Sequence, residues 1–175
     1  GSVRCLSETV PAPSPGASGV GPGAVLAAAE ELGSSEQDMA SALWTSAAIG
    51  ALIAEDAGVA GAEGGCQAEV GTASAMAAGA LAELLGGTPE EALAAASIAI
   101  GNLLGLVCDP VQGLVEYPCQ LRNAIGVASA MSAAQLAHAG IHPPLPFDEV
   151  VDAMAKVVHA LPAELRETAL GGLAA

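Results

Sequence analysis

Aromatic side chains are almost absent from this chain, and this absence constrains its fold more than any other feature. Trp44, Tyr117 and Phe147 are the only aromatic residues. The core therefore has to be built from Ala, Leu, Val and Ile, with Gly allowing helices to approach closely. Strands favour β-branched and aromatic residues, whereas small and straight aliphatic residues suit tight helix–helix packing. The composition predicts an all-α fold, a compact bundle of buried Ala/Gly-rich helices with cysteine-bearing loops.

Length and charge limit the classes of protein to which the chain can belong. Its 175 residues are enough for one domain with a real core. We expect a single domain over residues 1–175, with an irregular N-terminal loop over 1–21 and helices over 22–175. Nineteen acidic residues against four basic ones give a formal charge of −15. This charge argues against nucleic acid or an anionic membrane as a partner.

The hydrophobic composition also raises the question of a membrane. The longest uncharged helical stretch, from Ala92 to Cys108, is at the short limit for a span and contains Asn102 and two glycines. Basic residues are too few to flank spans on a cytoplasmic side. The start of the chain lacks the basic-then-apolar pattern of a signal peptide. We therefore expect a soluble, cytoplasmic protein with no membrane partner, in which cysteines serve a metal or catalysis rather than disulfides.

Local start and stop signals divide the chain into helices. Ser34-Ser35-Glu36-Gln37 resembles a capping box, and Thr88-Pro89-Glu90-Glu91 is a strong helix start. The glycine-rich stretch over 58–65 is expected to be a connector, and Asp109-Pro110 is expected to break a helix that runs toward Cys108. The expected helices cover residues 24–32, 36–56, 66–85, 89 toward 108, 119 to about 140, 147–161 and, as a short one, 163–170.

Three cysteines lie at the boundaries of these expected helices. Cys66 and Cys119 are at helix beginnings, where backbone N–H groups and the positive end of the helix dipole stabilise a thiolate. Cys108 is at a helix end beside a turn. One such cysteine is commonly a small buried hydrophobe, but three together favour metal ligands. Three thiolates can hold a metal or an iron–sulfur cluster and leave one position free for Lewis-acid catalysis. Cys5 is interpreted as a non-ligand.

The sequences around the cysteines form three motifs. They are GAEGGCQAEVG over 61–71, NLLGLVCDPVQGLVE over 102–116, and Pro118-Cys119 followed by Arg122-Asn123. These motifs resemble the alpha subunit or domain of iron–sulfur-dependent L-serine dehydratase, also called L-serine ammonia-lyase. The loop APSPGASGV over 12–20 and the tail RETALGGLA over 166–174 are similar to further parts of that family. The resemblance therefore extends over nearly the whole chain.

The resemblance implies a cofactor and a reaction. It implies a [4Fe–4S] cluster ligated by Cys66, Cys108 and Cys119, with one iron open to the hydroxyl of L-serine. Such a lyase dehydrates and deaminates L-serine to pyruvate and ammonia, in amino acid metabolism and gluconeogenesis. The Ser-Ser-His-Thr motif of the family's beta domain does not occur here. A beta subunit or domain, or a second protomer, is therefore the expected partner, beside the small amino-acid substrate.

Other polar residues in the motifs are candidates for catalysis and substrate binding. The candidate catalytic residues are Glu69, Arg122 and Asn123, and the candidate substrate-binding residues are Ser14, Gly16, Ser18, Gly19 and Gln67. Arg122 either forks a substrate carboxylate or pairs with Glu116 or Asp109. Glu69 is an acid–base group or an acceptor near a ligand, and the segment over 14–19 is an anion-binding loop or an ordinary turn.

Two alternative functions stay open at this stage. Pro15, where the family usually has Asn or Ala, allows a related cluster-dependent lyase for cysteine, threonine or a tailored hydroxy-amino acyl group. In the other alternative the chain is a non-catalytic helical module or binds zinc, because three thiolates and a water also suit Zn²⁺.

Overall fold

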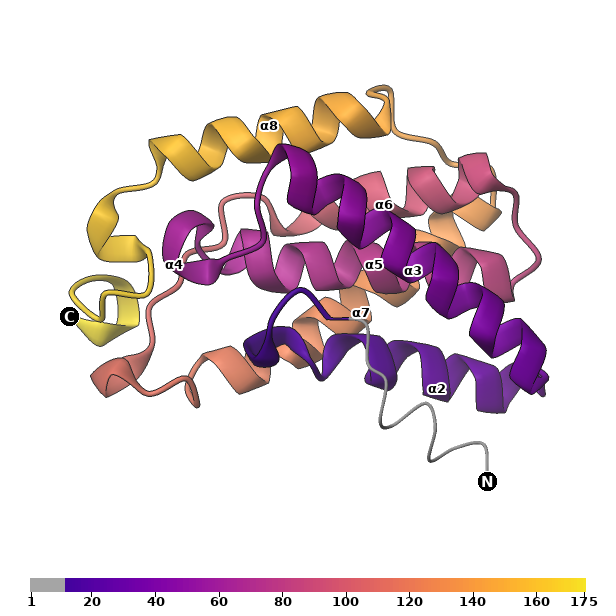
Figure 1. The fold of residues 1–175 in the computed structure, drawn as a ribbon, viewed down its shortest axis with the longest axis horizontal. Coiled ribbons are helices and arrows are strands. Elements are labelled where there is room, and N and C mark those ends of the chain that lie inside the picture. The colour runs from indigo at the N-terminus through magenta and orange to yellow at the C-terminus, as the bar shows by residue number, and fades with distance from the viewer. Residues whose placement is uncertain (1–11) are drawn as a thin grey trace.

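The structure of the chain is a computed structural model that describes residues 12–175, so Cys5 lies outside the described residues. Within residues 12–175 the chain forms helices joined by turns and loops, and no strand is present (Figure 1). The one strand-like pairing in this range is an isolated bridge between Cys108 and Arg166. The all-α prediction is therefore confirmed. None of the helices described is both long and apolar enough to cross a membrane.

The elements follow one another in a simple order. The long helices are α2 (Val20–Leu32), α3 (Glu36–Asp56), α5 (Thr72–Leu84), α6 (Pro89–Leu103), α7 (Cys119–His138) and α8 (Phe147–Ala160). Short helical segments lie between and after them: η1 (Pro15–Ala17), α4 (Gly61–Gly64), the π-helical η2 (Gln67–Gly71), η3 (Val111–Gly113), η4 (Ala163–Leu165) and η5 (Gly172–Ala174).

Capping boxes start both α6 and α3. The box at Thr88 is the expected one, whereas the box of α3 is formed by Ser35 and Asp38, one residue later than the expected segment from Ser34 to Gln37. The Thr88 hydroxyl accepts a hydrogen bond from Glu91 N at 3.2 Å, and Glu91 Oε2 accepts one from Thr88 N at 2.7 Å. At α3 the cap is Ser35, whose hydroxyl accepts from Asp38 N at 3.2 Å while Asp38 Oδ2 accepts from Ser35 N at 2.9 Å. Each box satisfies two backbone donors that the first helical turn leaves free.

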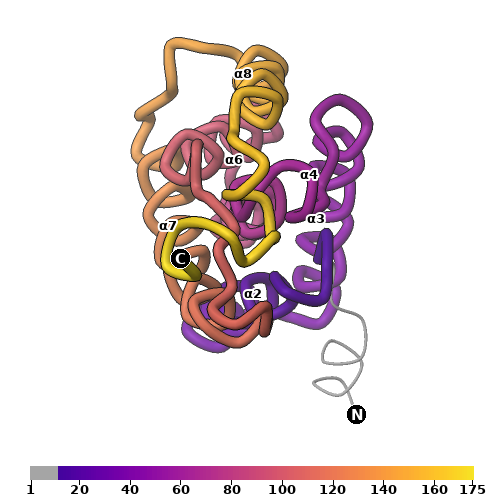
Figure 2. The backbone as a smooth tube through the Cα atoms, turned by 90° about the vertical axis from the view of Figure 1, so that its left-hand side faces the viewer, coloured from indigo at the N-terminus to yellow at the C-terminus, as the bar shows by residue number. Residues whose placement is uncertain are grey.

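Helix α5 is the centre of the bundle. It packs against α2, α3, α6 and α7, and Figure 2 shows these helices nearly end-on. Every residue from Thr72 to Ala82 is buried, because the helix is apolar or small on all sides. Glycine also allows α7 to approach its neighbours closely. A β-carbon added to Gly126 of α7 would lie 2.9 Å from Val20 Cγ2 and 3.1 Å from Val70 Cγ1.

Four expected boundaries differ from the structure. Helix α2 begins at Val20 and not at residue 24, so Pro22 lies within its first turn. Proline is tolerated there because the N–H groups of the first turn have no partner inside the helix. One helical turn, α4, lies inside the expected connector over 58–65. Helix α6 ends at Leu103, since Gly105 has a positive φ of 82°, so Cys108 lies in a loop and not at a helix end. Only Ala163–Leu165 of the expected helix over 163–170 is helical.

The bundle brings distant segments to one end. Figure 1 shows α4, the loop that leads into α7 and the C-terminal segment at the same end of the molecule. Hydrogen bonds join the loop to the C-terminal segment: Cys108 N donates to Leu165 O at 2.9 Å and Glu167 N donates to Cys108 O at 2.8 Å. The cysteines of the motifs lie in or next to these segments: Cys66 follows α4, Cys108 lies in the loop and Cys119 begins α7.

We expect the variant Gly126→Ala to lower the free energy of unfolding, measured by chemical denaturation. The added methyl group overpacks a contact between two buried valines whose χ1 angles are stiff, at a cost of about 1–3 kcal/mol. In the matched variant Gly101→Ala on α6, nothing lies within 4 Å of the new methyl group. That variant should stabilise the protein by up to about 1 kcal/mol through helix propensity. Equal effects at the two positions would contradict the close packing described.

Candidate metal centre

The three cysteines of the motifs meet in the interior at this end of the bundle. Their sulfur atoms all lie within 4.8 Å of one another. Cys66, Cys108 and Cys119 are 0%, 1% and 2% exposed, and all three are free thiols. The structure therefore brings together the three residues that the sequence singled out as ligands.

Cys66 is held between α4 and η2. Gly65 has a φ of +73°, and a β-carbon there would lie 2.9 Å from Leu106 O, so this turn favours glycine. Gln67 then ties the turn to the loop before Cys108: its backbone N donates to Leu106 O at 2.9 Å, and its Oε1 accepts from Gly105 N at 2.7 Å. This double contact fixes the distance between the segments that carry Cys66 and Cys108.

Cys108 and Cys119 come from the loop before α7 and from its first residue. The backbone of Cys108 pairs with the C-terminal segment at Leu165 and Glu167, as described above. The intervening loop turns back on itself, and Val111 N donates to Tyr117 O at 3.0 Å. A cis peptide bond joins Tyr117 to Pro118 directly before Cys119.

The cationic side chain at the cluster is Arg122, one turn into α7. Its Nη1 lies 3.6 Å from Cys66 Sγ, and it donates to Val107 O at 2.8 Å and to Asp109 Oδ1 at 2.7 Å. Burial alone would lower the pKa of Arg122, but its hydrogen bonds to Cys66 and Asp109 raise that pKa. Of the two roles expected for this side chain, the structure shows the pairing with Asp109.

The thiols differ in their tendency to ionise. A hydrogen bond from the Cys108 thiol, together with Arg122, lowers the pKa of Cys66. The same hydrogen bond raises the pKa of Cys108, because the proton stays on that sulfur. Burial raises the pKa of Cys119 although it begins a helix, so its position at the helix start does not decide its ionisation. Binding of a soft cation needs deprotonated sulfurs, so it would release the protons that the three thiols carry.

The N-terminal loop reaches the site through Glu69 and Asn123. The Ser14 hydroxyl donates to Glu69 Oε1. Asn123 Nδ2 donates to Gly16 O at 2.7 Å, and Asn123 Oδ1 accepts from Gly19 N at 3.1 Å. A β-carbon on Gly16 would lie 2.5 Å from Glu69 Oε1, so the absence of a side chain there leaves room for the carboxylate. The structure thus gathers five of the expected site residues.

Ser18 and Gln67 complete the set of expected residues. The Ser18 hydroxyl donates to Pro15 O at 2.8 Å, inside its own turn, and is exposed. Gln67 is buried beside Cys66, and its Nε2 has no hydrogen-bond partner among the residues described. A buried amide donor without a partner is costly, which makes Gln67 a candidate for contact with a bound group.

Asp109 is a site residue that the sequence reasoning named only as one possible partner of Arg122. It is 2% exposed, and its Oδ2 accepts a hydrogen bond from Leu173 N at 2.8 Å while Oδ1 binds Arg122. The available signal was the position of Asp109 directly after Cys108 in a chain with only four basic residues. Its contact with the C-terminal segment has no signal in the sequence.

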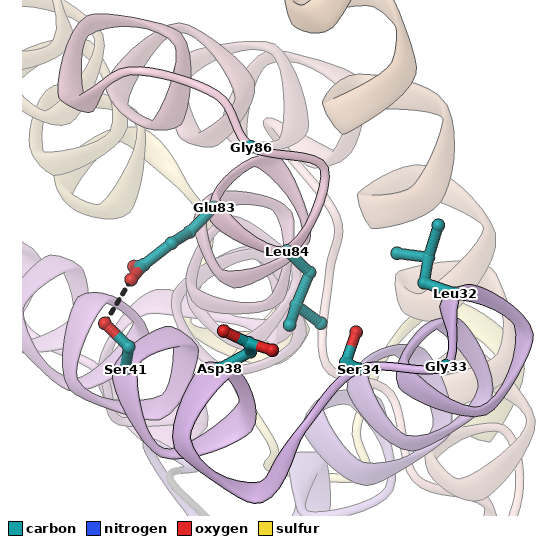
Figure 3. Close-up of a pocket in the computed structure, with 8 residues that line it drawn as sticks. All are labelled: Leu32, Gly33, Ser34, Asp38, Ser41, Glu83, Leu84 and Gly86. Atoms are coloured by element: carbon teal, nitrogen blue, oxygen red, sulfur yellow. Dashed lines mark hydrogen bonds between the residues drawn. The ribbon is translucent and has the colours of Figure 1, made fainter.

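A second concavity lies at the opposite end of the bundle, where α2 and α5 end and α3 begins (Figure 3). Glu83 in its wall accepts hydrogen bonds from the hydroxyls of Ser41 and Thr45, and Asp38 is engaged with Ser35. Its carboxylates therefore already have partners on the protein. The cysteine cluster is the stronger candidate for a functional site.

Comparison with known proteins agrees with the motifs around the cysteines. The family model described as "Serine dehydratase alpha chain" matches residues 5–174. The chain is 54% identical over 97% of its length to the L-serine dehydratase alpha chain of Peptoniphilus asaccharolyticus. It is 52% identical over 93% of its length to the probable L-serine dehydratase alpha chain of Bacillus subtilis strain 168. It is also 44% identical over 95% of its length to the L-serine dehydratase of Helicobacter pylori strain 26695.

These relatives are longer than this chain. The matched region makes up 58% of the Peptoniphilus asaccharolyticus protein, 54% of the Bacillus subtilis protein and 37% of the Helicobacter pylori protein. The chain therefore spans about half the length of the two alpha chains that it matches, and less of the third relative.

We expect the variant Asn123→Ala to release the N-terminal loop from α7. It removes the hydrogen bonds to Gly16 and Gly19, each of which contributes about 0.5–1.5 kcal/mol. Hydrogen exchange at the Gly19 amide should then become about tenfold faster, or more, in mass-spectrometric measurements. The control Gln120→Ala changes an exposed residue in the same helix turn and should leave this exchange unaltered. Unchanged protection in both variants would show that Asn123 does not hold the loop.

Proposed function

The chain belongs to the serine dehydratase alpha-chain family, and from this premise we propose that it carries the catalytic centre of an L-serine ammonia-lyase. The proposed reaction eliminates water from L-serine and yields pyruvate and ammonia. The observation that carries the proposal is the group of three buried cysteine sulfurs, contributed by separate segments and lying within 4.8 Å of one another.

The donor set fits a [4Fe–4S] cluster held by Cys66, Cys108 and Cys119. Thiolates are the usual ligands of such clusters, and an unpartnered amide donor, Gln67 Nε2, is buried next to the first of them. When bound through three cysteines, the cluster supplies a Lewis-acidic iron for the hydroxyl of the substrate. This support comes from the chemistry of the side chains and from the family.

In this proposal Glu69 accepts the α-proton of the substrate. Its carboxylate is half-buried and is held by the Ser14 hydroxyl, which orients it. A base has to be fixed within reach of the proton that it removes. Asn123 acts beside it by ordering the backbone at Gly16 and Gly19.

The substrate carboxylate is assigned to the N-terminal loop and the start of α2. Ser14, Gly16, Ser18 and Gly19 lie directly before or at this helix start. Backbone amides in the first turn of a helix have no partner inside the helix, and such positions bind carboxylates. The loop would thus hold the substrate on the side of Glu69.

We propose that a second chain or domain completes the substrate pocket. Two of the relatives are named alpha chains, and the described chain spans about half of their length. The unbridged thiols suit a reducing compartment such as the cytoplasm. The substrate assignment to L-serine follows the names of the relatives and is to be tested against threonine and cysteine.

Anaerobic reconstitution with iron and sulfide tests the cofactor. We expect about four irons and four sulfides per chain, with a broad visible absorption. Single Cys→Ser variants at positions 66, 108 and 119 should each lose most of the iron, since each removes one ligand. Cys5→Ser is the matched control and should keep it.

Either the absence of a cluster or the absence of pyruvate release would contradict this proposal. A chain that stays colourless and free of iron after reconstitution has no cluster, and a tight zinc complex in its place would favour the zinc-binding alternative. Release of pyruvate from L-serine tests the reaction. In this assay the reconstituted chain is supplied with the beta chain that accompanies a related alpha chain. Faster turnover of threonine or cysteine would reassign the substrate.

A further inference from the structure

The Nη1 nitrogen of Arg122 is engaged by the protein itself. A single nitrogen, Nη1, contacts Cys66 Sγ, the carbonyl of Val107 and the carboxylate of Asp109. The arginine and aspartate side chains are 15% and 3% exposed. The pair is therefore well shielded from water, and its positive charge is already balanced by a carboxylate.

Asp109 is in turn fixed from the other side. Its second oxygen accepts the Leu173 amide at 2.8 Å, and a β-carbon on the neighbouring Gly172 would lie 2.5 Å from that oxygen. The φ of Gly172 is +65°, so both the conformation and the space favour glycine here. The C-terminal segment thus closes over Asp109 and prevents the carboxylate from turning away from Arg122.

We propose that Arg122, held in place by Asp109, is a positioning residue for the metal ligand Cys66 and does not bind the substrate carboxylate. This inference rests on the proposed function in one respect, namely that a metal binds the cysteines. An N–H donor beside a metal ligand orients that ligand, and here the donor is Nη1, 3.6 Å from Cys66 Sγ. Because Val107 O accepts a hydrogen bond from the same nitrogen, Arg122 also joins the loop before Cys108 to α7.

The geometry makes two conservative substitutions informative. Arg122→Lys keeps the positive charge, but the lysine side chain is shorter and ends in a tetrahedral ammonium group. Its nitrogen therefore cannot take the position and the N–H directions of Nη1. Asp109→Asn keeps the shape of the side chain and removes the charge that orients the arginine. Arg166→Lys is the matched control. Arg166 is near the site, but among residues 12–175 the one hydrogen bond of its side chain is to Glu63 O, at 3.4 Å.

Cobalt binding tests the proposal without requiring an iron–sulfur cluster. The probe is Co²⁺ alone, added anaerobically to the full chain and followed by the thiolate-to-metal absorption. We expect Arg122→Lys and Asp109→Asn to weaken the apparent Kd about 10–100-fold, as is typical for residues that support metal ligands. Arg166→Lys should bind as the unmodified chain does. Circular dichroism of the metal-free proteins checks that each variant is folded. If Arg122→Lys does not fold, the cobalt affinity of Asp109→Asn decides the test.

The outcomes separate this inference from the proposed function. Unchanged cobalt affinity in both variants would overturn the inference, as would an unmodified chain that binds no Co²⁺ at its thiols. Cobalt binding that depends on Arg122 and Asp109, in a chain that takes up no iron–sulfur cluster, would support the inference and refute the proposed function. In the enzyme, a raised KM for L-serine in Arg122→Lys with unaltered cobalt affinity would assign the arginine to the substrate instead.

Discussion

The close approach of four helices to α5 is the constraint on which the rest of the structure depends. Helix α5 follows the η2 turn, so its fixed place in the core also fixes Cys66 just ahead of that turn. Gly126 lets α7 pack closely against Val70 of η2 and Val20 of α2. The position of Cys119 at the start of α7 follows from that contact. The cysteine cluster is therefore located by packing between helices, and hydrogen bonds around it refine the arrangement.

Much of this organisation could be predicted from the sequence because it is local. The capping boxes at Ser35 and Thr88 depend on residues three positions apart, and they define the starts of α3 and α6. The near absence of aromatic residues indicated the all-α core. The grouping of Cys66, Cys108 and Cys119 was expected from their motifs and is confirmed by their sulfur distances.

What the sequence did not predict depends on contacts between distant segments. Cys108 was expected at a helix end, but Leu104 is extended and the loop after it pairs with residues 165–167. The position of Asp109 depends on a hydrogen bond from the backbone amide of Leu173. Any residue type except proline could supply that amide, so no side-chain pattern in the sequence predicts this contact. The positive φ angles of Glu167 and Ala169 likewise end the expected C-terminal helix for reasons that only the packing reveals.

The origin of the three cysteines in separate segments has a consequence for folding. A group bound to all three sulfurs would close two loops of the chain at once, and it would bind the folded state in preference to the unfolded one. Its binding free energy would then add to the stability of the whole bundle. Loss of that group by oxidation or chelation would consequently weaken the junction of η2, the loop before α7 and the C-terminal segment together. The resistance of the chain to unfolding and to proteolysis would then depend on how much of the group is bound.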